Sequence, residues 1–342
     1  MNWETTGRDK AMHRRTFNTT ALAALVLGLG SSVSMADEKS VVIGQFGDPT
    51  PTQLVAASDE LSKATGYKIE WRKFASGAEV IAAMASGDIK LSQLGSSPFA
   101  IAASQGVDLQ LFMISEGIGS AEALIARNGT GIEKVEDLKG KKVATPLGST
   151  AHFSLMGALA NAGVAEGDVT VVGMKPDEIA AAWSQDQIDA AFMWQPVQSK
   201  LLANGKMIIN AGQVTGKPTF NGWVVNREWA EQNKDFMVAF VKAEGKAFDD
   251  YNSNSAAWTP DSAEVKAIAE RTGAAPADIP DILKGYSFPA LKDQASEAWL
   301  GGAMTKNAAA TAQFLVAQKR IPAALDDYSK FITTDYLNAA MK

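Results

Sequence analysis

One order of elements occurs twice along this chain of 342 residues, and it restricts the fold more than any other feature. Residues 78–98 contain a helical segment, a polar turn, an apolar strand and a helix start with a proline. Residues 176–196 repeat that order. Strands alternating with helices at this spacing are typical of α/β layers with parallel strands. We therefore predict two similar α/β lobes that face each other across a cleft at the C-terminal strand ends, where ligands bind in open α/β sheets.

Apolar runs and turn residues place the individual elements. Strands are expected at 41–44, 68–72, 91–94, 142–144, 169–172 and 190–193, and helices at 78–85, from about Pro98, at 153–162 and at 176–183. Two further extended segments, 123–126 and 222–226, are expected to cross between the lobes. The chain from Glu228 onward has helical spacing and should rejoin the first lobe. We thus expect lobe 1 to hold residues 37–124 plus 227–342, and lobe 2 to hold residues 125–226.

The first residues have the three parts of a secretory signal peptide. The basic pair Arg14-Arg15 precedes the apolar run 21–30, and the small-x-small site 34–36 follows. This run is shorter than the roughly 20 residues of a membrane span. We expect residues 1–36 to comprise an N-terminal extension, with the true start at Met12, and a signal peptide cleaved near Ala36. The arginine pair leaves both Sec and twin-arginine export open.

Composition excludes several classes of function. The net charge is −6, so the basic surplus that nucleic acid or an anionic membrane would need is missing. No second apolar run of spanning length follows the leader, which argues against membrane insertion. The chain has no Cys, and His152 is the sole histidine after the leader, so thiol nucleophiles and zinc clusters have no residues to form them. We expect a binding protein with no catalytic residues, no cofactor and no metal.

Three loops stand after a predicted strand and before a predicted helix. Unpaired N–H groups, hydroxyls and the positive end of the helix dipole can bind an anion at such a place without Lys or Arg. The alternative is that the loop hydroxyls are simple N-caps. The loops are Ser96-Ser97-Pro98, Ser149-Thr150-Ala151 and Trp194-Gln195-Pro196.

Aromatic and acidic residues near these loops are further candidates. Trp194 and Trp223, at predicted strand or loop ends, are expected to wall the cleft and to pack a methylene stem or a cationic head. His152 could donate to an anion or be an ordinary hydrogen-bonded histidine. Asp48 and Glu122 are candidate partners for a ligand cation, although a loop Asp is often a turn former. The remaining tryptophans are assigned to the core or to lobe packing: Trp71, Trp183, Trp229, Trp258 and Trp299.

Several segments spread over almost the whole chain after the leader resemble the taurine-binding proteins of ABC importers. This family lies in a wider group that includes binders of alkanesulfonates, nitrate and thiamine precursors. The resemblance implies an α/β fold of two lobes, as in type II periplasmic binding proteins, with parallel or mixed sheets flanked by helices and two crossing hinge segments. The segments are 71–74, 76–78, 85–88, 95–98, 120–124, 181–183, 311–315 and 327–329.

The resemblance also implies a function and a site. The protein would be a periplasmic receptor, acting as a monomer, that closes on taurine or a similar sulfonate and delivers it to a membrane permease with its ATPase. Ser96, Ser97, Ser149 and Thr150 would hold the sulfonate, and the two cleft tryptophans would pack the ligand. The full set of expected ligand-binding residues is Phe46, Asp48, Ser96, Ser97, Glu122, Ser149, Thr150, His152, Trp194, Asn221 and Trp223.

Two positions depart from the family pattern. The family carries an acidic residue where this chain has Asn221, and a Glu near the position of Thr50. Acids there would suit the ammonium of taurine, and Asp48 and Glu122 are the candidates to supply the missing charge. The alternatives are a sulfonate without an amine, nitrate or a quaternary amine as ligand. A same-fold enzyme, like the thiamine-pyrimidine synthases, is disfavoured because such sites are rich in His and Cys.

Overall fold

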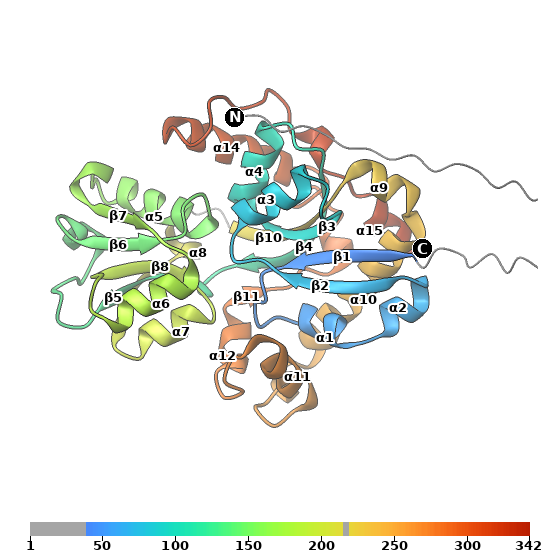
Figure 1. The fold of residues 1–342 in the computed structure, drawn as a ribbon, viewed down its shortest axis with the longest axis horizontal. Helices are drawn as coiled ribbons and strands as arrows, with labels where there is room; N and C mark the ends of the chain where they lie inside the picture. The colour runs from blue at the N-terminus through green and yellow to red at the C-terminus, as the bar shows by residue number, and fades with distance from the viewer. Residues whose placement is uncertain (1–38, 215–218) are drawn as a thin grey trace, which may run out of the picture. The chain divides into compact units, whose positions relative to one another are not determined.

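Two mixed β-sheets organise the computed structural model, which describes residues 39–214 and 219–342 (Figure 1). The predicted leader, residues 1–36 with the cleavage site near Ala36, lies outside the described residues. The first sheet has the order β11–β4–β10–β3–β1–β2, formed by β1 (Ser40–Gln45), β2 (Lys68–Lys73), β3 (Leu91–Gly95), β4 (Gln110–Ile118), β10 (Thr219–Val225) and β11 (Tyr286–Ser287). The second has the order β7–β6–β8–β5–β9, formed by β5 (Glu122–Arg127), β6 (Lys142–Thr145), β7 (Thr170–Gly173), β8 (Ala190–Trp194) and β9 (Gly205–Asn210).

The two sheets are built on the same plan. Strands β2, β1 and β3 of the first sheet are parallel, as are β7, β6 and β8 of the second. An antiparallel strand follows in each case, β10 beside β3 and β5 beside β8. This correspondence confirms the prediction of two similar α/β units with parallel and mixed sheets.

The chain crosses between the sheets at other residues than the sequence predicted. The predicted crossing segment 123–126 lies within β5, paired on both sides with β8 and β9. The other, 222–226, is largely β10, paired on both sides with β3 and β4. Backbone groups bonded on both sides within one sheet are not free to bridge two sheets. The chain instead leaves the first sheet at residues 119–121 and is part of it again in β10, which begins at Thr219. We propose that lobe 2 begins after residues 119–121 and that β10 belongs to lobe 1.

Helices cover both sheets, and two of them begin earlier than predicted: α4 at Ser96 rather than near Pro98, and α5 at Thr150 rather than Phe153. No helix in residues 39–214 and 219–342 is long and apolar enough for a membrane span. The helices of the N-terminal part are α1 (Thr52–Ala57), α2 (Glu60–Thr65), α3 (Gly77–Ala85) and α4 (Ser96–Ser104). Those of the second lobe are α5 (Thr150–Asn161), α6 (Pro176–Ser184), α7 (Val197–Leu202) and α8 (Ala211–Val214). The C-terminal part has α9 (Arg227–Gln232), α10 (Lys234–Asn254), α11 (Ala263–Thr272), α12 (Ile279–Lys284), α13 (Leu291–Gln294), α14 (Ala303–Ala317) and α15 (Asp335–Ala340).

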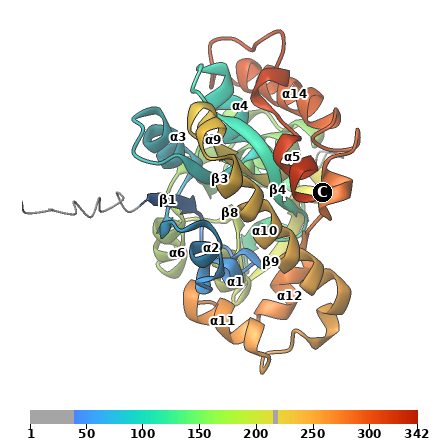
Figure 2. The same ribbon diagram turned by 90° about the vertical axis from the view of Figure 1, so that its right-hand side faces the viewer.

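The C-terminal helices contribute to the core around the first sheet. Helix α10 packs against α15, α2 and α1, and Figure 2 shows it beside α1 and α2. It buries Phe236, Phe240 and Phe248, which recur at helical spacing, in one cluster with the strands of the first sheet. The tryptophans assigned to packing lie in or against the hydrophobic cores: Trp71, Trp183, Trp229, Trp258 and Trp299.

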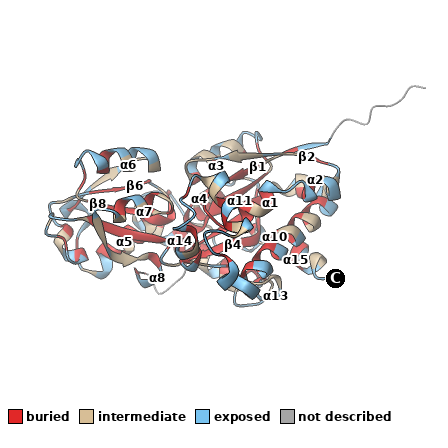
Figure 3. Ribbon diagram, turned by 90° about the horizontal axis from the view of Figure 1, so that it is seen from below, coloured by how far each residue is buried: buried red, intermediate tan, exposed pale blue. Residues whose placement is uncertain are grey.

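The second sheet has a separate core on each face. Leu124 and Ala126 of β5 belong to one apolar cluster, while Ala123 and Ile125 belong to the other. Successive side chains of a strand point to opposite faces, so this alternation means that both faces of the sheet are covered. Figure 3 shows buried residues in the middle of each lobe and exposed ones on the outer helix surfaces, while the edge strands β7 and β9 are only half-buried.

We predict that Phe240→Ala removes about 3–5 kcal/mol from the free energy of unfolding, measured by urea denaturation. Phe240 is fully buried, and its ring packs at 4.9 Å from the Trp223 ring and 6.0 Å from the Phe112 ring. The control is Phe153→Ala, because Phe153 is half-buried and pairs with Phe314. An equal loss in the two variants would contradict this account of the core.

Candidate functional site

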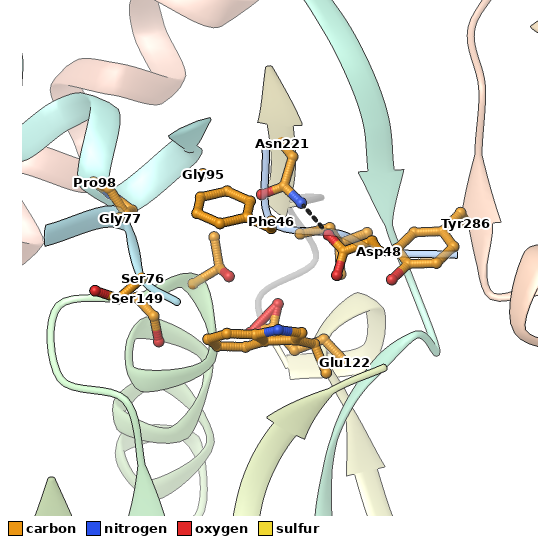
Figure 4. A pocket seen from close by; sticks show the side chains of 13 residues that line it. Phe46, Asp48, Ser76, Gly77, Gly95, Pro98, Glu122, Ser149, Asn221 and Tyr286 are labelled. Atoms are coloured by element: carbon orange, nitrogen blue, oxygen red, sulfur yellow. Dashed lines mark hydrogen bonds between the residues drawn. The ribbon is translucent and has the colours of Figure 1, made fainter. Parts of the chain in front are cut away.

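A cavity of about 430 Å³, including its opening to solvent, is lined by residues of both lobes. Figure 4 shows the side chains that line it. These residues are Phe46, Asp48, Ser76, Gly77, Gly95, Pro98, Ile118, Glu122, Ser149, Thr150, Trp194, Asn221 and Tyr286.

Several lining residues stand at the C-terminal ends of parallel strands. Phe46 follows β1, Gly95 ends β3, Ser149 follows β6 and Trp194 ends β8. Open α/β sheets bind ligands at this edge because the loops there are not bound by sheet hydrogen bonds. The predicted position of the cleft is therefore confirmed.

Three helices begin at the cavity wall. Ser76 is the N-cap of α3, Gly95 of α4 and Ser149 of α5. The Ser76 Oγ accepts the Glu79 N–H at 3.3 Å, and the Ser149 Oγ accepts the His152 N–H at 3.1 Å. No side chain caps α4, whose first N–H groups start beside Gly95. Together the three helix starts give this end of the cavity a positive potential without a Lys or Arg among its lining residues.

Two glycines allow these helix starts to come together. A Cβ on Gly77 would lie 2.4 Å from the Pro98 Cγ, which is too close for α3 and α4 to keep their places. A Cβ on Gly95 would lie 3.0 Å from the Thr150 Cγ2, on the other lobe. Because both positions are glycines, the starts of all three helices can lie close together at one end of the cavity.

The opposite end of the cavity is acidic. Figure 4 shows Asp48, Glu122, Asn221 and Tyr286 apart from Ser76, Gly77 and Pro98. Burial raises the pKa of Asp48 to about 7, against a smaller opposing effect of the Lys73 charge. Burial also raises the pKa of Glu122 to about 8; the Thr150 hydroxyl lowers it and the Asp48 charge raises it further.

Neither carboxyl oxygen of Glu122 has a partner with hydrogen-bond geometry among the described residues. Tyr286 lies beside the acids, and its burial raises the pKa of its phenol well above the ordinary value. This end of the cavity therefore contains carboxyl groups that a cation would help to ionise.

Two more buried carboxyls lie behind the cavity wall and do not line it. Glu116 of β4 accepts hydrogen bonds from Ser115 and from the Asn221 Nδ2, the latter at 2.6 Å. Glu244 of α10 accepts the Thr52 hydroxyl at 2.7 Å. Burial raises the pKa of each to about 8, and for Glu116 the Asp48 charge adds to the rise.

Seven of the eleven predicted site residues line the cavity: Phe46, Asp48, Glu122, Ser149, Thr150, Trp194 and Asn221. The other four, Ser96, Ser97, His152 and Trp223, do not line it.

The two serines are displaced because α4 begins at Ser96, two residues before the predicted start. Gly95 and Pro98 line the cavity in their place. Ser96 instead faces a second hollow beside α5 and α14, and Ser97 is fully buried.

His152 and Trp223 are turned away from the cavity. The His152 Nδ1 accepts the Gly148 N–H at 3.2 Å, and burial lowers the pKa of the imidazole to about 4, so the ring is neutral. Trp223 is fully buried in the first core, 6.2 Å from Trp71 and 4.9 Å from Phe240 between ring centroids. The expectation that it walls the cleft is therefore wrong.

The third predicted anion loop contributes only Trp194. The Gln195 Oε1 accepts the Ser199 N–H of α7 at 3.2 Å, so a side chain already satisfies a donor at this helix start. Neither Gln195 nor Pro196 lines the cavity, so the start of α7 is not among the helix starts at its wall.

Six lining residues were not predicted: Ser76, Gly77, Gly95, Pro98, Ile118 and Tyr286. Ser76-Gly77 follows a predicted strand and precedes a predicted helix, so the rule used for the other loops could have found it. Tyr286 lies in the two-residue strand β11, far along the chain, and no local signal marks it.

We predict that Glu244→Gln stabilises the protein more at high pH than at low pH. The pKa of Glu244 rises from 4.5 to about 8 on folding, so the native state holds this proton more tightly than the unfolded chain. The stabilisation that this raised pKa gives the native state is fully present below about pH 4.5 and is lost as the pH rises through 8. The unfolding free energy of the variant minus that of the wild type should increase by about 1–3 kcal/mol between pH 5 and pH 9.

Urea denaturation at several pH values measures this difference. Glu228→Gln is the matched control, because the Glu228 side chain is exposed. A difference that stays constant with pH for Glu244→Gln would contradict the expectation.

Comparisons with known proteins extend this picture. The NMT1/THI5 like family matches residues 53–256. The taurine-binding periplasmic protein of Escherichia coli (strain K12) is 35% identical over 315 residues, which cover 92% of this chain and 97% of that protein.

Solved structures share the fold. The alkanesulfonate-binding protein SsuA from Xanthomonas axonopodis pv. citri bound to MOPS has a TM-score of 0.68 at 23% identity, covering 83% of this chain and 94% of that one. The desulfurization enzyme DszB has a TM-score of 0.61 at 14% identity, covering 89% of this chain and 99% of that one. The two-lobed fold of periplasmic binding proteins is thus confirmed, and by the family match and the near full-length relative the chain belongs to the NMT1/THI5 like family.

Proposed function

We propose that this protein is the exported solute-binding component of an ABC import system, and that it captures taurine or a related small sulfonate between its lobes. The observation that carries the proposal is the polarity of the cavity, with helix N-termini at one end and buried carboxyls at the other. Taurine carries a sulfonate and an ammonium at the two ends of a short chain, so its charges match this polarity. The 35% identity to a taurine-binding protein supports the same ligand class.

The sulfonate belongs at the helix end. Its three oxygens accept hydrogen bonds in several directions, as three helix starts from two lobes require. Ser149 and Thr150 of one lobe and the start of α4 in the other approach each other here, since Gly95 leaves room for Thr150. Binding an anion at this point would favour closure of the lobes.

The ammonium belongs at the acidic end. Asp48 and Glu122 supply the charge that Thr50 and Asn221 lack, since both carboxyls line the cavity. An ammonium between them would lower their raised pKa values and restore the carboxylate forms. Phe46 and Trp194 line the space between the two ends and would pack the methylene stem.

A binding role fits the residues better than an enzymatic one. The chain has no Cys, and the neutral His152 lies outside the cavity. Similarity to an enzyme such as DszB does not decide the matter, because the fold also carries binding proteins. In this proposal the protein leaves the cytoplasm by its signal peptide, acts in the periplasm as a monomer and delivers its ligand to a permease with a cytoplasmic ATPase.

We predict that taurine binds the purified protein and that its affinity rises between pH 6 and pH 8. The carboxyls of Asp48 and Glu122, with pKa values of about 7 and 8, ionise over this range and attract the ammonium more strongly. Titration calorimetry with taurine and propane-1-sulfonate, which lacks the amine, measures both affinities. The affinity for propane-1-sulfonate should stay constant or fall over the same range.

The other candidate ligands are outcomes of the same experiment. Equal affinity for the two sulfonates would indicate a receptor for amine-free sulfonates, and tighter binding of N-trimethyltaurine would indicate a quaternary amine. Nitrate is included as a separate titrant. No binding of any sulfonate at millimolar concentration would refute the proposal.

Among the residues that the structure describes, two ion pairs join the lobes and should favour the closed state. The Lys175 Nζ lies 2.8 Å from the Glu79 Oε1, and an Arg320 nitrogen lies 3.3 Å from the Glu166 Oε1. The other oxygen of Glu79 accepts the Ala75 N–H at 3.0 Å, just before the α3 start. The first pair therefore connects the second lobe directly to a helix that begins at the cavity.

We predict that Lys175→Ala weakens ligand binding by about two- to fivefold, the range expected for an exposed ion pair. The matched control is Lys139→Ala, because Lys139 pairs with Asp168 within its own lobe at 3.6 Å. Calorimetry at low and high salt measures the effect, which should shrink as salt screens the pair. A loss of the same size in both variants would argue against a closure role for Lys175.

A further inference from the structure

A buried glutamine behind the cavity connects the loop of Asp48 to a helix of the C-terminal part. Gln53 of α1 is 1% exposed and does not line the cavity. Its Nε2 donates to the Asp48 carbonyl oxygen at 3.0 Å and to the Gln45 Oε1 at 2.7 Å. Its Oε1 accepts the Nε–H of Arg271, in α11, at 3.2 Å. The amide therefore has a partner for each of its two N–H groups and for its oxygen.

The orientation of this amide follows from Arg271. A guanidinium can only donate hydrogen bonds and keeps its proton at any working pH, so Gln53 must turn its oxygen to Arg271 and its NH₂ to the Asp48 carbonyl. The remaining partner, Gln45, is a neutral amide. No titrating group takes part, so the arrangement is the same whether the carboxyls near the cavity are ionised or neutral.

The contact with Gln53 fixes the backbone of Asp48. The same carbonyl oxygen accepts the Thr50 N–H at 2.8 Å, so both of its lone pairs are used. Pro49 follows, and a residue before a proline is restricted to extended conformations. Two donors therefore hold the peptide group after Asp48, and with it the direction in which the carboxyl leaves the backbone.

The carboxyl of Asp48 has little else to hold it. Among the described residues, its one hydrogen bond is the long contact of 3.4 Å from the Asn221 Nδ2. Gly47, just before it, has a φ of 80°, and a glycine restrains the chain less than any other residue. The place of this carboxyl thus depends on the hold that Gln53 has on the loop.

We infer that Gln53 is a positioning residue for ligand selection, which favours an ammonium-bearing ligand by holding the Asp48 carboxyl at the acidic end of the cavity. The inference rests on the proposed function, since it presumes a sulfonate with an amine at that end. Without Gln53 the loop can turn the carboxyl away from the ammonium. A sulfonate without an amine makes no use of Asp48 and should not be affected.

The test measures the affinities for taurine and propane-1-sulfonate by calorimetry at pH 8 in the wild type and in Gln53→Met. Methionine is unbranched and has no amide, so the variant removes the contact and keeps most of the side-chain volume. The preference for taurine should fall about five- to tenfold, while the affinity for propane-1-sulfonate changes by less than about twofold. In an Asp48→Asn background the same change should leave the preference within about twofold, because Gln53 acts through Asp48.

Two further variants separate positioning from stability. Gln294→Met is the matched control, because Gln294 is a fully buried glutamine that bonds the backbone of Ile114 and Pro289, and none of the three lines the cavity. It should keep the wild-type preference. Arg271→Ala changes an exposed residue and leaves Gln53 in place without the group that orients it. Here the preference should fall about threefold.

Each result decides one of the two claims. A preference for taurine that stays within about twofold of the wild-type value in Gln53→Met overturns the inference. An equal loss of both ligands, or an equal effect in the Asp48→Asn background, also overturns it, since either one indicates a merely structural role. If Gln53→Met does not fold, an unchanged preference in Arg271→Ala overturns the inference. A wild type that binds neither sulfonate overturns the proposed function, and the inference with it.

Discussion

The parallel strands of both sheets end at one cavity, and the rest of the site depends on this constraint. Each sheet receives its antiparallel strand next to the crossing, β5 as the chain enters the second lobe and β10 as it returns. The loops after β1, β3, β6 and β8 then supply the cavity wall. Because these loops are not bound within a sheet, their N–H groups and side chains are available to a ligand. A short polar molecule held there contacts both lobes at once.

The two ends of the cavity carry their opposite charges by different physical means. At the helix end the positive potential comes from backbone dipoles, which are fixed by the fold and need no buried cation. At the acidic end desolvation pushes the carboxyls toward their neutral forms, so their charge depends on what binds. An empty site therefore avoids the full cost of buried charges, and a ligand ammonium restores the ionised state that holds it.

The elements and much of the site were predictable from the sequence, since strand ends, glycines and helix starts are local signals. The failures arose where side-chain position depends on tertiary structure. The sequence places Trp223 at the cleft because 222–226 reads as a crossing segment. In the structure β10 runs antiparallel to β3, so Asn221 in its first half meets the cavity and Trp223, two residues on, packs against Phe240 in the core. The prediction that Ser96 and Ser97 line the cavity is wrong because α4 begins two residues earlier than expected. This shift turns different atoms to the cavity. Tyr286 comes from a distant part of the chain and leaves no local pattern.

The Asn at position 221 has a physical rationale in the buried carboxyls around it. Asp48, Glu116, Glu122 and Glu244 are all buried, and the first two lie within hydrogen-bond reach of the same amide nitrogen. An acid at 221 would face two carboxyls at this distance, and one of the three would have to keep a proton. The amide instead donates to both neighbours and retains an oxygen for the ligand. Its oxygen lies beside Gly95 at the start of α4. The amide therefore adds no further charge to a group of buried carboxyls whose raised pKa values already destabilise the empty protein at high pH.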